Sequence, residues 1–90
     1  MKDLSQHDTI LWGMLNNPQK EWWSAVDFQH GEYFVGYEAT ARMSELVMKY
    51  PTLVKRDMQD KYRVIGIYWE NSQEVKEQKE RIQMIINSQK

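Results

Sequence analysis

The hydrophobic period of this sequence changes at Pro51, and this change constrains the fold more than any other feature. Before Pro51, apolar residues recur at steps of three and four, as on one face of a helix of about 14 residues; they are Val35, Ala39, Met43, Leu46 and Tyr50. After it, residues 53–56 and 62–69 are rich in β-branched and aromatic side chains, which is typical of strands. The chain is therefore expected to join a helix to a β-hairpin, with residues 57–61 as a polar connection.

Capping patterns predict the remaining helices. A serine or asparagine that is followed three residues later by an acidic residue is typical of a helix start. The chain has three such pairs, which are Ser5 with Asp8, Ser24 with Asp27, and Asn71 with Glu74. They predict helices over 5–16, 25–30 and 72–88. Trp23 and Phe28 have the spacing of a hydrophobic staple around the short middle helix.

Size and composition indicate a single domain over residues 1–90. The chain is 41% hydrophobic and has four tryptophans, which is enough for one small core. We expect Trp23, Tyr33 and Phe34 to belong to it, and Trp22 to cover its edge or to stay exposed. No apolar run approaches the roughly 18 residues of a membrane span, and the first residues lack the apolar core of a secretion signal. The sequence therefore predicts a cytoplasmic protein without a membrane partner.

Residues that could carry catalysis or bind a cofactor are sparse. Cysteine is absent, which excludes disulfides, thiol catalysis and zinc–thiolate sites. The two histidines, His7 and His30, have no metal-ligand spacing around them. The four glycines are too far apart for a phosphate-binding loop. We therefore expect no metal, no cofactor, no small-molecule substrate and no enzymatic activity.

The charge of the chain is nearly balanced, at −1, but one stretch is basic. Residues 53–63 hold four cations, Lys55, Arg56, Lys61 and Arg63, against the two anions Asp57 and Asp60. Such a surplus favours an anionic partner such as phosphate. The alternative is that these charges solvate the edge of the hairpin and prevent strand pairing with other chains.

Two short segments resemble a known family. Residues 24–28 (SAVDF) and 39–46 (ATARMSEL) are similar to the second and third helices of winged helix-turn-helix domains in small phage and bacterial DNA-binding proteins. Residues 50–54 resemble the turn into the wing. The resemblance implies an α+β fold with three helices and a β-hairpin wing over residues 5–69. The helix at 71–88 lies outside the shared pattern as an addition.

The resemblance also implies a function. The third helix would enter the major groove of double-stranded DNA, with base readout from Thr40, Arg42 and Ser44. The wing would contact phosphates through its four cations, Lys55, Arg56, Lys61 and Arg63. The exposed face of the third helix has no cation at its centre, however, and Arg42 is expected to pair with Glu38 or Glu45 on its own helix.

A protein-interaction module of the same fold, without DNA binding, is the alternative. Tyr37 and Met48 would then form a contact surface on the third helix, since both fall on its outer face. The apolar stripe of the last helix, which includes Ile82 and Ile86, would join two chains into a homodimer or pack back on its own domain.

Overall fold

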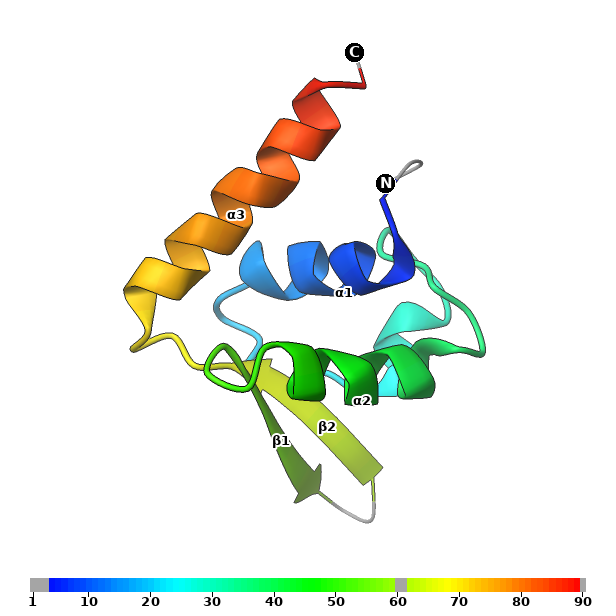
Figure 1. Ribbon diagram of the computed structural model, residues 1–90. Coiled ribbons are helices and arrows are strands. Elements are labelled where there is room, and N and C mark those ends of the chain that lie inside the picture. Colours follow the sequence, from blue (N-terminus) through cyan, green and yellow to red (C-terminus); the bar gives the residue numbers. More distant parts are fainter. Residues whose placement is uncertain (1–3, 60–61, 90) are drawn as a thin grey trace.

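A computed structural model describes residues 4–59 and 62–89, and Figure 1 shows their arrangement. In chain order the elements are α1 (Gln6–Leu15), the short 3-10 helix η1 (Ala25–Phe28), α2 (Ala39–Lys49), β1 (Val54–Gln59), β2 (Tyr62–Ile67) and α3 (Ser72–Asn87). The two strands form an antiparallel hairpin, as the change of period at Pro51 predicts. The chain is thus a small α+β domain. None of the described helices is both long enough and apolar enough to cross a membrane.

Two of the three predicted helix starts are confirmed by their hydrogen bonds. The backbone N–H of Asp8 donates to the Ser5 hydroxyl at 3.1 Å, and the backbone N–H of Ser24 donates to the Asp27 carboxylate at 2.8 Å. Helix α3 begins at Ser72, as predicted, but its N-cap Asn71 makes no side-chain capping bond to the helix backbone. The Asn71 side chain donates instead to the Glu74 carboxylate at 2.9 Å and to the Thr52 carbonyl at 3.0 Å. These bonds tie the start of α3 to the segment that leads from α2 into β1.

Several predicted boundaries are wrong, and hydrogen bonding explains them. The middle helix ends at Phe28, and α2 begins only at Ala39, although the apolar period starts at Val35. The Phe28 carbonyl accepts the backbone N–H groups of Val35 and Gly36 at 2.7 and 3.0 Å, and Gly36 has φ +98°. Residues from Val35 onward are therefore held in a loop that brings the chain back to η1 before the helix can begin.

In the hairpin, strand β1 extends further than the sequence predicts, and strand β2 ends earlier. Residues 57–59, expected as a connection, belong to β1, where Asp57 pairs with Val64 and Gln59 with Tyr62. Strand β2 ends at Ile67 rather than at residue 69. Hairpin pairing supplies the hydrogen bonds of β1, so its polar residues stay extended despite their weak β-propensity.

The core lies between the three helices and the base of the hairpin. Its fully buried large side chains include Ile10, Leu11, Met14 and Leu15 of α1, Leu46 of α2, and Ile82 of α3. Ala39, Met43 and Leu46 are all buried, which confirms the predicted inner face of α2. The staple is also confirmed, because Trp23 stacks on Phe28 with 5.2 Å between ring centroids.

Phe34 differs from the prediction. Its side chain is 61% exposed, whereas both of its neighbours in the chain are directed inward. Tyr33 packs against the core, and Val35 is buried within it. The inward positions on both sides of Phe34 are thus taken by its neighbours, and the Phe34 ring is left at the surface.

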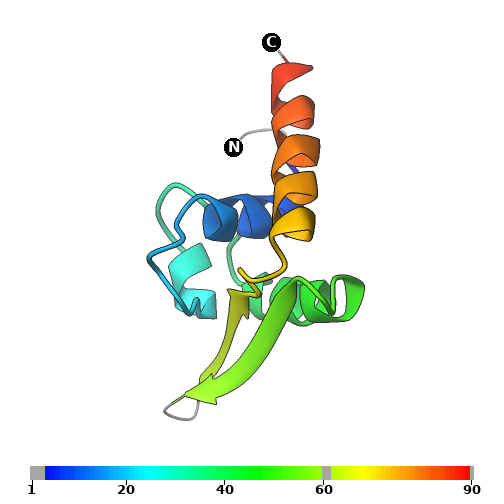
Figure 2. The ribbon, with the colours of Figure 1, turned by 90° about the vertical axis from the view of Figure 1, so that its left-hand side faces the viewer.

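Helix α3 packs against α1 of its own chain, as Figures 1 and 2 show from two directions. Ile82 is fully buried, and Val75 and Ile86 pack around the same core. Arg81 donates two hydrogen bonds to the Asp8 carboxylate, at 2.7 and 3.2 Å. This hydrogen bonding raises the pKa of Arg81 above its ordinary value, against the opposing effect of desolvation. The apolar stripe of α3 was expected either to join two chains or to pack on its own domain. In the structure it packs on its own domain.

A third segment borders the hairpin. Trp23 and Ile65 exchange two backbone hydrogen bonds of 2.8 and 2.9 Å, so β2 lies between β1 and the chain at Trp23. Beside this bridge, a Cβ atom added at Gly66 would lie 2.5 Å from the carbonyl oxygen of Glu21. Gly66 is therefore required by the close approach of two backbones.

We expect Gly66→Ala to lower the free energy of unfolding by about 1–3 kcal/mol, because backbone on both sides must shift to relieve the overlap. Urea denaturation followed by tryptophan fluorescence measures this loss. A midpoint equal to that of the parent protein would contradict the close packing of Glu21 on β2.

Candidate nucleic-acid interface

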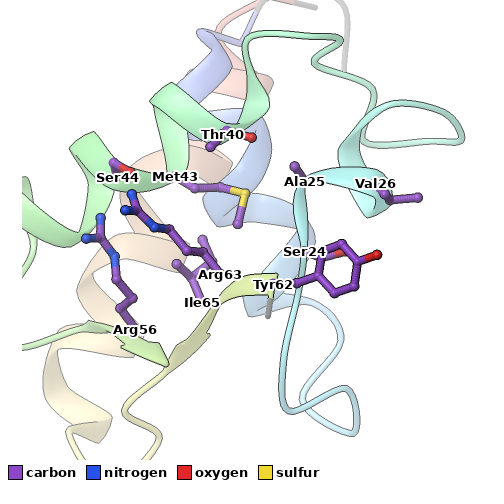
Figure 3. A pocket seen from close by; sticks show the side chains of 10 residues that line it. All are labelled: Ser24, Ala25, Val26, Thr40, Met43, Ser44, Arg56, Tyr62, Arg63 and Ile65. Carbon is purple, nitrogen blue, oxygen red and sulfur yellow. The ribbon is translucent and has the colours of Figure 1, made fainter. Parts of the chain in front are cut away.

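A hollow of about 210 Å³ lies between α2, the hairpin and η1, on the side of α2 away from α3 (Figure 3). We call it the α2–hairpin pocket. Its walls come from three places in the chain: Thr40, Met43 and Ser44 of α2; Arg56, Tyr62, Arg63 and Ile65 of the hairpin; and Ser24, Ala25 and Val26 at η1. Four of the residues predicted to bind DNA, Thr40, Ser44, Arg56 and Arg63, therefore lie together here.

Strand register places Arg56 and Arg63 on the same face of the hairpin. Arg56 lies opposite Ile65, and Met58 lies opposite Arg63. Side chains alternate between faces along a strand, so residues 56 and 63 are diagonal neighbours on the face toward α2. Figure 3 shows both guanidinium groups directed toward α2 near Ser44.

The two arginines have no carboxylate partner among the described residues. Two other cations of the described residues do have one: Lys20 lies 3.3 Å from the Asp27 carboxylate, and Arg81 is bound to Asp8. The nearest anion along β1, Asp57, is on the opposite face and accepts the backbone N–H of Met58 at 2.7 Å. Two adjacent unpaired guanidinium groups make the pocket a site of positive potential, which attracts anions.

The basic cluster that the sequence predicts is divided by the fold. Lys55 is on the other face of the hairpin, where its ammonium group lies 4.8 Å from the centre of the Trp22 ring and 5.8 Å from that of Tyr68. Trp22 is half-buried and holds the Lys55 ammonium group by a cation–π contact. Lys61 lies outside the described residues. Of the three predicted hairpin cations that the structure describes, the pocket contains Arg56 and Arg63.

Arg42 also lies away from the pocket. Thr40 and Ser44 are on the flank of α2 that borders the hairpin, whereas Arg42 is on the flank toward α1. Its Nε atom lies 3.0 Å from the carboxylate of Glu45, which confirms the predicted pairing on its own helix. The same carboxylate oxygen of Glu45 lies 2.7 Å from Nε2 of His7 in α1. Glu45 is thus turned toward α1, where it links the two helices.

The sequence did not point to the apolar and aromatic part of the pocket. Met43 and Ile65 form its floor as part of the core, and Val26 and Tyr62 stand at its rim with 56% and 69% of their surface exposed.

The residues of the protein-interaction alternative are also divided. Tyr37, expected on the third helix, lies in the loop before α2 and is 97% exposed, and Met48 near the end of α2 is 82% exposed. Ile82 is buried and Ile86 half-buried against the core. Among the described residues, no cluster of three or more histidine, aspartate or glutamate side chains could hold a metal ion.

Comparison of the chain with protein-family models, with curated proteins and with solved structures finds no significant match.

Proposed function

We propose that this chain is a small DNA-binding domain of the winged-helix type, which holds backbone phosphates of double-stranded DNA in the α2–hairpin pocket. The observation that carries this proposal is the pair Arg56 and Arg63, two guanidinium groups without a carboxylate partner among the described residues. Guanidinium is the side-chain group that matches phosphate best, because its planar donors bind two oxygens at once.

Affinity and sequence preference would come from different elements. Phosphate contacts from the hairpin position the duplex but carry no sequence information. Thr40 and Ser44 border the same pocket on α2, and their hydroxyl groups can donate to or accept from base edges. Because Arg42 is held by Glu45, it contributes little to this readout. The domain would act by equilibrium binding, with weak discrimination between sequences.

A salt-dependent titration of the protein with a pool of fluorescent duplexes tests the proposal. Each phosphate contact releases counterions, so two contacts give a plot of log affinity against log salt with a slope of about −2. A slope near zero, or no binding to any duplex at low salt, would contradict DNA binding.

A protein-interaction module without DNA binding is the second candidate. It is supported by the exposure of Met48 on α2 and of Tyr37 in the loop that precedes α2, since large exposed apolar side chains are available to a partner. This candidate predicts no duplex binding in the titration above, and the two functions are therefore distinguished by that one measurement.

A further inference from the structure

The loop between η1 and α2 carries a second surface that the DNA-binding proposal does not use. We call residues 29–38 the aromatic loop. Phe34 and Tyr37 project from it with 61% and 97% of their surface exposed. Together with His30 and Gly36 they line a hollow of about 260 Å³.

Hydrogen bonds and buried side chains hold the backbone of the aromatic loop, from which the rings of Phe34 and Tyr37 project. Val35 is buried, and its N–H and that of Gly36 donate to the Phe28 carbonyl at 2.7 and 3.0 Å. Tyr33 packs so closely on α1 that a Cβ atom at Gly13 would lie 2.8 Å from its ring. A loop that is already ordered loses little conformational entropy when a partner binds.

The charge of the aromatic loop is opposite to that of the α2–hairpin pocket. Glu32 and Glu38 flank the aromatic residues in the sequence, and both are exposed. No described residue forms an ion pair with either of them, so both carboxylates are available to a cationic partner. Two unpaired carboxylates would repel nucleic-acid phosphates, which makes DNA an unsuitable occupant of this surface.

We propose that the aromatic loop docks a basic segment of a protein partner. A lysine or arginine of that segment packs on the exposed ring faces of Phe34 and Tyr37, where cation–π attraction holds it. Neighbouring cations of the segment pair with Glu32 and Glu38. Aromatic rings next to unpaired carboxylates favour a cationic partner over an apolar or acidic one, and this docking is independent of DNA binding in the α2–hairpin pocket.

The test is a calorimetric titration of the full chain with a short peptide in which lysine, leucine and arginine alternate. We expect saturable binding that Phe34→Ala with Tyr37→Ala weakens about tenfold or more, since exposed aromatic anchors of this kind dominate such contacts. The pair Glu32→Gln and Glu38→Gln should weaken binding about fivefold and reduce its dependence on salt.

The matched control is Glu77→Gln with Glu80→Gln, which removes the same charge from exposed residues of α3. It should change affinity less than about twofold. Equal losses in the control and the loop variants would overturn the proposal, as would absence of peptide binding or self-association of the chain through the loop. The glutamine variants decide the question if the aromatic variant fails to fold, which circular dichroism monitors.

Discussion

Replacing Arg56 and Arg63 together with alanine should weaken binding to duplex DNA about a hundredfold at low salt, for all sequences alike. Each arginine that neutralises a phosphate releases counterions, and this release is most favourable when salt is dilute. The plot of log affinity against log salt should become flatter by about two units. Fluorescence anisotropy with two unrelated duplexes measures both quantities.

The matched control for this variant is Lys76→Ala with Lys79→Ala. These lysines are exposed on α3, on the far side of the domain from the α2–hairpin pocket, so their loss removes the same charge without touching the site. Affinity should change less than about threefold, since screening limits distant surface charges. Similar losses in both double variants would mean that DNA responds to overall charge, and the pocket would lose its proposed role.

Leu46→Ala should lower the free energy of unfolding by about 2–5 kcal/mol. Leu46 is fully buried at the centre of α2, in the core that α2 shares with α1 and the hairpin. Truncation removes apolar contacts and leaves a cavity that the surrounding elements cannot fill. Urea denaturation, followed by far-ultraviolet circular dichroism, measures the loss.

Met48→Ala is the control within the same helix, because Met48 is 82% exposed. It should change stability by less than about 0.5 kcal/mol. If Leu46→Ala also costs less than about 0.5 kcal/mol, the inner face of α2 has been assigned wrongly. The two substitutions together test the orientation of α2, on which the position of Thr40 and Ser44 in the α2–hairpin pocket depends.

The sequence alone determined those features that depend on neighbours along the chain. The inner face of α2 follows from the spacing of Ala39, Met43 and Leu46, and the stop at Pro51 follows from the restricted backbone before proline. Ser5 caps α1, and Trp23 stacks on Phe28, through contacts within a few residues. Such interactions are encoded in a short window, so a pattern in that window predicts them.

Four of the seven predicted DNA-binding residues lie together in the α2–hairpin pocket, whereas Arg42 and Lys55 lie elsewhere. Arg56 and Arg63 meet because strand pairing sets them on one face, while the adjacent Lys55 falls on the other and rests on Trp22. Which residues of a basic run share a face depends on register, and register is fixed by pairing across the hairpin. The run of charges in the sequence carries no such information.

Only the tertiary structure decided where the remaining groups find their partners. The backbone N–H of Asp8 serves the start of its own helix as expected, but its carboxylate binds Arg81, which lies 73 residues further along the chain. Ile82 became part of the core because α3 packs on α1, and Phe34 was left outside because its neighbours occupy the inward positions. These outcomes depend on contacts between elements far apart in sequence, where burial and charge pairing are settled by the packing of the whole domain rather than by local pattern.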